Sequence, residues 1–402
     1  MELCMDIKNF ALNSTEKLEA EIKAFAETYP MQGQKIRIMP DGHSGKGCTV
    51  GSVFTFDDML NPQAVGCDIA CSVTAFHLPV HANDIDFEKL DSVVHARVPR
   101  GEAVHREKIQ FSKNFNYSNF RFWRHLTDEQ RNRAGRSMGT LGASNHFLSI
   151  EQDGDNNCYM VVHCGTRSMG VYAFDYYLDK AKRCCNSEYG KEQNRIKEIA
   201  NTLKEAGKTE DIALLFERLH DKKINHTPFL TGDVLKDYLH DIHICEEWVM
   251  LSHRYMFQSI CDDMGWDWSF FNNNIHSVHN TVDASRNIVR KGATSAEAGQ
   301  LGIVPLNMGD GSLIVRGKGN ADWLYSLPHG AGRIMGRAEA KRNLSMDDYK
   351  EAMKGIYTSC VRESTIDESP MSYKNADEIA RAIEPNGEIV ARLRPLYNYK
   401  AV

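Results

Sequence analysis

No stretch of this 402-residue sequence has about twenty consecutive apolar residues, so no membrane-spanning helix is predicted. The first residues lack a basic segment followed by an apolar one, which argues against a secretory signal. The eleven cysteines are irregularly spaced and do not have the pattern of a disulfide framework. Together these absences predict a cytoplasmic protein that has no membrane partner and whose cysteines are free thiols.

The sequence also lacks an excess of positive charge. It has 48 Lys and Arg against 54 Asp and Glu, a formal net charge of −6, so any contact with nucleic acid must come from a local patch. Internal repeats and low-complexity tracts are absent as well. The 42% of hydrophobic residues is enough for a sizeable core, and strand and helix patterns alternate along the chain, which predicts an α+β fold.

Hydrophobic patterns predict the main elements. A helix is expected at 14–29, a mostly helical region at 172–264, and a further short helix after each of Ser345 and Lys374. Strands are expected at 35–39, 49–56, 72–78, 147–151, 158–163 and 312–316. The strands at 147–151 and 158–163 are predicted to form a hairpin, because an Asp-Gly-Asp-Asn-Asn turn separates them.

One local patch of positive charge does stand out, at 97–136. Ten Lys and Arg against four Asp and Glu give this segment a net charge of +6. Six aromatic residues are interleaved with the charges, a mixture that suits single-stranded RNA. The alternative is a solvated insertion whose aromatic rings anchor it to the core. The rings are Phe111, Phe115, Tyr117, Phe120, Phe122 and Trp123.

The segment Ser-Leu-Pro-His-Gly-Ala-Gly-Arg-Ile-Met-Gly-Arg centres on His329. Gly330 and Gly332 let the backbone approach a bound group closely. Arg333 and Arg337 would share one face if this segment opened a helix, whose N-terminus would then lie beside the imidazole. Such a histidine can attack phosphorus and carry the group covalently. A Gly-rich turn with a packed histidine is the alternative.

Five further side chains have the chemistry of metal ligands. Asp68 and Cys71 lie in one short turn, and His146, His163 and His279 each lie at a predicted strand end or turn. A carboxylate, a thiolate and three imidazoles suit divalent transition metals, and a thiolate can bridge two ions. The five positions span more than two hundred residues, so a buried free cysteine with three unrelated histidines is the alternative from the residues alone.

The order of these motifs is the most specific feature of the chain. Gly-Cys-Asp-Ile-Ala-Cys at 66–71, Asn-His-Phe at 145–147 and His-Cys-Gly-Thr-Arg at 163–167 are followed by His-Asn at 279–280 and His-Gly-Ala-Gly-Arg at 329–333. Met-Pro-Asp-Gly-His at 39–43 precedes them. In this order, from about residue 36 to 400, the motifs resemble the RtcB family of RNA ligases.

The resemblance implies an RtcB-like fold, in which mixed β-sheets are surrounded by helices with helical insertions, and one catalytic domain over 1–402. It implies that the five candidate ligands bind two Mn²⁺ ions and that GTP guanylylates His329. The reaction implied is the joining of RNA ends that carry a 2′,3′-cyclic phosphate or 3′-phosphate to a 5′-hydroxyl end, through a histidine–GMP intermediate and a 3′-guanylylated RNA. An RNA repair role, rather than tRNA splicing, is the expectation for a divergent, bacterial member.

The resemblance also assigns the residues around the nucleotide. Asp41 and His43 are expected to orient or activate a group of the metal site. The residues expected to bind nucleotide or phosphate are Asn145, Arg167, Asn280, Lys291, Asn307, Met308, Ser312, Gly330, Ala331, Gly332, Arg333, Arg337, Tyr373 and Lys400.

The sequence departs from the family in the nucleotide motifs. Ser149 stands where the family has a glutamate that reads the guanine edge, and the motifs around Asn307, Tyr373 and Lys400 are also altered. A serine hydroxyl carries no charge. Unless a neighbour supplies the missing carboxylate, we therefore expect weaker selection of GTP over ATP. Two other functions remain open, a metal-dependent RNA phosphodiesterase or end-healing enzyme that uses no nucleotide, and a non-catalytic RNA-binding protein.

Overall fold

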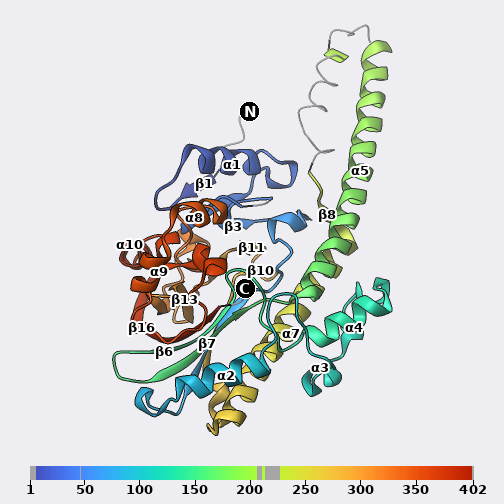
Figure 1. Ribbon diagram of the computed structural model, residues 1–402. Helices are drawn as coiled ribbons and strands as arrows, with labels where there is room; N and C mark the ends of the chain where they lie inside the picture. The colour runs from blue at the N-terminus through green and yellow to red at the C-terminus, as the bar shows by residue number, and fades with distance from the viewer. Residues whose placement is uncertain (1–5, 46, 206–210, 213–226, 401–402) are drawn as a thin grey trace.

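The computed structural model describes residues 6–45, 47–205, 211–212 and 227–400 (Figure 1). Helices and strands alternate along the chain, which confirms the predicted α+β class. The larger sheet has seven strands, and every neighbouring pair in it is antiparallel. In spatial order its strands are β13 (Leu301–Asn307), β14 (Gly311–Gly317), β16 (Gly387–Lys400), β6 (Phe147–Gln152), β7 (Cys158–Cys164), β5 (Ser72–Leu78) and β9 (Asn274–Val278).

A second sheet of five strands is mixed. The strands β1 and β2 pair in parallel, and all other neighbouring strands of this sheet pair antiparallel. Its strands are β1 (Asp6–Asn9), β2 (Lys35–His43), β3 (Val50–Thr55), β11 (Ile288–Lys291) and β10 (Asn280–Asp283). Two two-stranded sheets complete the described strands. They pair β12 (Ala293–Ser295) with β15 (Ser326–Pro328), and β4 (Met59–Leu60) with β8 (Leu230–Thr231).

Helices surround these sheets, and one of them, α5, projects well beyond the body of the molecule (Figure 1). Helix α7, which is also long, packs against α2, α5 and β7. The helices are α1 (Glu16–Ala26), α2 (Phe87–Arg97), α3 (Gln110–Asn114), α4 (Asp128–Ser137), α5 (Ser168–Glu205), α7 (Gly232–Met264), α8 (Arg337–Asn343), α9 (Met346–Ala352) and α10 (Ala376–Ala382).

The local patterns predicted most of these elements. The Thr15 hydroxyl accepts a hydrogen bond from the backbone N–H of Leu18 and so caps α1, as its position before an amphipathic run indicates. Helix α7 ends at Gly265, which takes the left-handed conformation usual after a helix. The β6–β7 hairpin and β5 match their predicted ranges closely. Part of the helical region expected at 172–225 lies outside the described residues.

Strand β6 shows how the seven-stranded sheet separates two environments. Leu148 and Ile150 face one core cluster, which also contains buried residues of α2 and α7. Because side chains alternate along a strand, Phe147, Ser149 and Glu151 face the opposite side. That side of β6 borders the cavity described below.

One predicted feature around His329 is wrong. No helix starts directly after it, and the next helix, α8, begins only at Arg337. Gly332 has a φ of +73°, and a side chain there would collide with the backbone carbonyl of Asp41. The close approach of these two backbone segments therefore excludes a regular helical turn. A strand that the patterns did not indicate, β16, occupies the last fourteen described residues.

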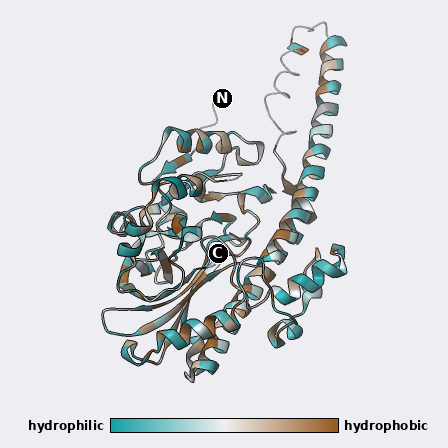
Figure 2. Ribbon diagram, viewed as in Figure 1, coloured by the Kyte–Doolittle hydropathy of each residue, from teal (hydrophilic) through white to brown (hydrophobic). Residues whose placement is uncertain are grey.

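The basic segment 97–136 forms the end of α2, then α3, α4 and short 3-10 turns. Phe120 and Phe122 are buried and so cannot stack on RNA bases, and Phe111, Phe115 and Trp123 are partly buried against the same core cluster. The aromatic rings therefore anchor the segment, as the alternative proposed. Helix α4 is mostly hydrophilic on the surface (Figure 2). Contact of its charges with RNA stays a prediction.

Candidate functional site

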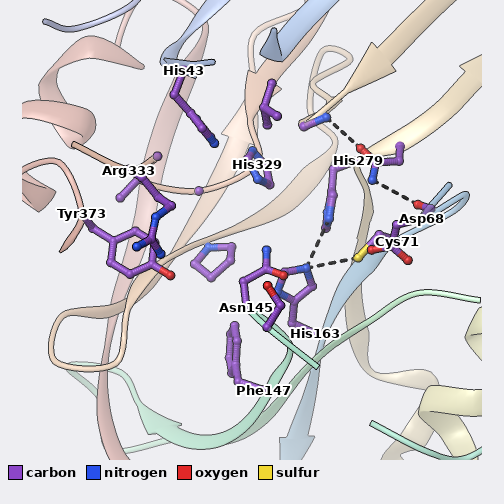
Figure 3. Close-up of a pocket in the computed structure, with 18 of the residues that line it drawn as sticks. His43, Asp68, Cys71, Asn145, Phe147, His163, His279, His329, Arg333 and Tyr373 are labelled. Atoms are coloured by element: carbon purple, nitrogen blue, oxygen red, sulfur yellow. Dashed lines mark hydrogen bonds between the residues drawn. The ribbon is translucent and has the colours of Figure 1, made fainter. Parts of the chain in front are cut away.

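A cavity of about 440 Å³ lies between the two large sheets and the loop that follows β15. Its lining includes Asp68, Cys71, His163, His279 and His329. In Figure 3, Cys71, His163 and His279 gather on one side of the cavity, Arg333 and Tyr373 lie on the other, and His329 lies between them. The lining of the cavity also includes most of the residues that are expected to bind nucleotide. These are Asn145, Asn280, Lys291, Asn307, Met308, Gly330, Ala331, Gly332, Arg333, Arg337, Tyr373 and Lys400.

The five candidate metal ligands come together where four neighbouring strands of the seven-stranded sheet begin or end. The strands β6, β7, β5 and β9 are consecutive neighbours there. Because they are antiparallel, the starts of β5 and β6 lie beside the ends of β7 and β9. Each candidate ligand lies at or just beyond one of these strand ends, so residues distant in sequence become neighbours.

The donor atoms form two groups that share one thiol. Cys71 Sγ lies 3.3 Å from His146 Nε2 and 3.3 Å from His163 Nε2. His163 Nε2 lies 3.3 Å from His279 Nε2, and His146 Nε2 lies 3.2 Å from Asp68 Oδ2. One group is Cys71, His163 and His279, the other is Asp68, Cys71 and His146, and the donors of each lie within 4.8 Å of one another.

The electrostatics of these groups fit cation binding. Burial and the neighbouring imidazoles lower the pKa values of His163 and His279 well below the usual range, so both imidazoles are neutral, the form that can bind a metal ion. Burial and the Asp68 carboxylate raise the pKa of Cys71. A bound cation would reverse that shift and hold the thiolate. Burial opposes the charged form of His146, but Cys164 and Asp68 outweigh it and raise its pKa to about 10, so metal binding there would release a proton.

Two glycines make room for this arrangement. A side chain at Gly165 would collide with the Asp68 carboxylate, and one at Gly142 would collide with the imidazole of His146. Both glycines therefore keep the ligand side chains in place by their lack of a Cβ atom. The donor set, its compactness and its shared thiol fit a pair of divalent transition metal ions.

His329 is held by a buried carboxylate. Its Nδ1 atom lies 2.6 Å from Oδ2 of Asp41, which is fully buried. The carboxylate accepts a hydrogen bond from Nδ1–H, which leaves Nε2 as the ring nitrogen with a free lone pair. The ring of His329 lies 5.0 Å from that of His279, centre to centre. The two chemical groups predicted from sequence are therefore adjacent.

The turn that carries Asp41 is itself fixed from both sides. Lys374 donates to the backbone carbonyls of Pro40 and Gly42, at 2.9 Å each. His43 Nδ1 lies 2.8 Å from the Asp41 carbonyl oxygen, and the residue lines the cavity. Burial lowers the pKa of His43, which favours the neutral imidazole. His43 therefore supports the turn, and it lies nearer to His329 than to the metal ligands in Figure 3.

The side opposite the metal ligands contains a buried acid that the sequence analysis missed. Glu368 binds Arg337, Lys400 at 2.9 Å and the Tyr373 hydroxyl at 2.6 Å. Arg333 lies 3.4 Å from the same carboxylate. Burial opposes its ionisation, but Lys400 and Arg337 outweigh this and lower the pKa of Glu368 to about 2. No motif signals this role, because its partners are assembled only by folding.

Three predicted nucleotide residues contribute differently from the expectation. Arg167, with a φ of +57°, turns to Thr140 and to the carbonyl of Gly101 and does not line the cavity. Ser312 is fully buried behind the lining. Asn280 is structural as well as exposed to the cavity, because it donates to the Asp68 carbonyl and accepts from the Gly292 N–H.

No helix among the described residues is long and apolar enough to cross a membrane.

Residues 23–401 match the family model described as tRNA-splicing ligase RtcB. The chain is 28% identical to the RNA-splicing ligase RtcB of Escherichia coli strain K12, over 91% of this chain and 90% of that protein. It is 25% identical to the tRNA-splicing ligase RtcB of Aeropyrum pernix, over 89% and 86% of the two chains. This match over nearly the whole sequence, together with the order of the motifs, shows that the chain belongs to the RtcB family of RNA ligases.

Proposed function

We propose that this protein is a GTP- and Mn²⁺-dependent RNA ligase that joins 2′,3′-cyclic phosphate or 3′-phosphate ends to 5′-hydroxyl ends. The observation that carries the proposal is the position of His329, which is held by buried Asp41 at 2.6 Å beside the donor cluster. A nucleophile, an orienting acid and a metal site within one cavity are the components that nucleotidyl transfer needs.

Asp68, Cys71, His146, His163 and His279 would hold the two ions, and Cys71 belongs to both donor groups. When bound, the ions supply Lewis-acid stabilisation of negative charge on phosphate oxygens. The chain adds its own cations to the same cavity. Lys291, Arg333, Arg337 and Lys400 line it and would lower the cost of bringing a triphosphate inside.

In the first step, Nε2 of His329 attacks the α-phosphorus of GTP. The new N–P bond replaces the bond between that phosphorus and pyrophosphate, which leaves with its electron pair. The imidazole ring gains positive charge as the bond forms. The Asp41 carboxylate, buried and hydrogen-bonded to Nδ1, stabilises that charge and maintains the reactive tautomer.

The guanylyl group then passes from His329 to a 3′-phosphate oxygen of the RNA, and a cyclic phosphate is first opened by water to give that 3′-phosphate. The N–P bond breaks and a phosphoanhydride forms. Finally the 5′-hydroxyl oxygen attacks the activated 3′-phosphorus and GMP leaves, so the strands are joined by a phosphodiester. This last displacement does not need a free His329.

The test is the His329→Ala variant, incubated with Mn²⁺ and α-labelled GTP. We expect the acid-labile protein adduct and the joining of 3′-phosphate RNA to fall by at least about a thousandfold, the usual scale for a lost nucleophile. Joining of RNA that already carries GMP on its 3′-phosphate should persist. His81→Ala, at an exposed histidine, is the matched control.

An adduct in His329→Ala at the wild-type level would refute the assignment of the nucleophile. The absence of any adduct in the wild-type protein, together with hydrolysis of cyclic phosphate ends, would instead identify an end-healing enzyme that uses no nucleotide.

A further inference from the structure

A buried carboxyl group without a complete set of partners lies at the wall of the cavity. Glu151 is 2% exposed and lines the cavity. Its Oε1 atom accepts a hydrogen bond from the Ser149 hydroxyl at 2.7 Å. Its Oε2 atom has no hydrogen-bond partner among the described residues. A buried acceptor left without a donor is costly, so this atom calls for a ligand that supplies one.

The surroundings of this carboxyl group are polar but carry no paired cation. Ser312 lies beside it, yet the Ser312 hydroxyl also has no hydrogen-bond partner of good geometry among the described residues. Asn398, which pairs with Ser149 across β16 and β6, lines the cavity and has an unpartnered Oδ1 atom. Burial raises the pKa of Glu151 to about 7. Hydrogen bonds from Ser149 and Ser312 favour the ionised form but do not outweigh burial, so donors from a ligand would stabilise this carboxylate further.

The position of this group along β6 suits the base of a nucleotide. Phe147, on the same face of the strand, packs its ring 5.6 Å from that of the candidate ligand His163. Glu151 lies four residues further on, roughly 13 Å away by strand rise. Phe147 and Tyr373 line the cavity and offer flat apolar surfaces for a planar base. A phosphate near the metal ligands and a base near Glu151 would thus be bound by one continuous wall.

The acceptor pattern selects among the bases. A carboxylate presents two adjacent acceptors and, when ionised, no donor. Guanine presents two adjacent donors, N1–H and the 2-amino group, on one edge. On the corresponding edge adenine and cytosine each place a ring-nitrogen acceptor beside an amino group, and uracil has one N–H between two carbonyls. Guanine is therefore the base that satisfies both carboxylate oxygens.

We infer that Glu151 reads the base of the bound nucleotide, accepting hydrogen bonds from N1–H and the 2-amino group of guanine, while Ser149 holds the carboxylate in position. This inference rests on the proposed function for the identity of the site as a nucleotide pocket. It assigns the base-reading role to a residue two positions beyond Ser149, on the same face of β6. Ser149 then removes no carboxylate from the cavity, and its hydroxyl becomes a positioning group.

The experiment measures equilibrium binding of GMP, IMP and AMP to the Mn²⁺-loaded protein by calorimetry, which does not depend on catalysis. The wild-type protein should bind GMP more tightly than IMP, which lacks the 2-amino donor, and IMP more tightly than AMP. Glu151→Gln should lower the GMP-over-AMP preference on the order of tenfold to a hundredfold, because one acceptor becomes a donor. Glu388→Gln, at an exposed carboxylate of β16, is the matched control and should leave the preference unchanged.

A second variant guards against a folding defect in Glu151→Gln. The exchange Ser149→Glu with Glu151→Ser moves the carboxylate by one pleat repeat but leaves it on the same face. It should regain at least part of the preference that Glu151→Ser alone loses. A GMP-over-AMP preference that is absent in the wild type, or unchanged in both Glu151→Gln and Glu151→Ser, would overturn the inference.

Failure of the inference and failure of the proposed function give different results. If GTP forms the His329 adduct but base preference ignores residue 151, only the inference fails. If GMP preference depends on Glu151 but no adduct forms with any nucleotide, the proposed ligase mechanism fails and the guanine site remains.

Discussion

The two ends of the cavity, the candidate metal site and the wall formed by β6 and β16, are positioned by different features of the fold. At the metal end, the five donors come from four different strand termini, and Cys71 lies within 3.3 Å of two imidazoles. At the other end, the wall is one face of β6 and β16, where Ser149 pairs with Asn398. The metal end depends on five separate backbone positions, whereas the wall depends on the alternation of side chains along two strands.

This difference explains where the sequence has diverged. A metal donor that moved by two residues would leave the strand end and lose its distance to the other donors. A carboxylate that moves by two residues along β6 stays on the cavity face, because the side-chain period of a strand is two. The metal motifs are therefore intact, while the glutamate expected at 149 has a counterpart at Glu151.

The most severe way to break the metal end is to remove its shared donor. We expect Cys71→Ala to lose most of its bound metal and essentially all adduct formation, because each donor group then lacks one ligand. Elemental analysis after dialysis measures the metal, and labelled GTP measures the adduct. Cys261→Ala, at a buried thiol outside the cavity, is the control. Full metal occupancy with full activity would show that Cys71 is only a packed thiol.

A smaller effect separates the metal end from the nucleophile. In Asp41→Asn the side chain keeps its size but loses the charge that stabilises the imidazolium at His329. The adduct rate should fall roughly 10²–10⁴-fold, as for other histidines that lose an orienting carboxylate. Metal content should stay unchanged, because Asp41 belongs to neither donor group. A parallel loss of metal would contradict separate roles for the two carboxylates Asp41 and Asp68.

The smallest expected effect concerns pH and the base end. The pKa of Glu151, raised by burial to about 7, leaves its carboxyl mostly protonated at pH 6 and mostly ionised at pH 8. The ionised form accepts both guanine donors, whereas the protonated form can donate to N1 of adenine. GMP affinity should therefore rise about tenfold from pH 6 to pH 8, as the ionised fraction does, and the GMP-over-AMP preference should rise by at least as much.

Glu151→Gln should show no such rise. A preference that falls with pH in the wild type, or rises equally in Glu151→Gln, would mean that another group reads the base.

Local patterns predicted most elements because each depends on neighbours in sequence. The cap at Thr15, the turn at Gly265 and the β6–β7 hairpin are examples. Patterns failed where a distant segment decides the local geometry. The approach of Gly332 to Asp41 excludes the helix expected after His329, and pairing of β16 between β14 and β6 creates a strand with no clear signal.

The sequence by itself determined the family of this protein and its candidate chemical groups, since the identities and order of Asp68, Cys71 and His329 specify the family, a candidate donor set and a candidate nucleophile. Only the tertiary structure decided which side chains share a surface. Strand order brings the ligands to one sheet edge, burial turns the aromatic rings at 97–136 inward, and the pleat of β6 directs Glu151 into the cavity. The physical reason is that donor chemistry resides in single residues, whereas proximity and desolvation arise from contacts between segments far apart in the chain.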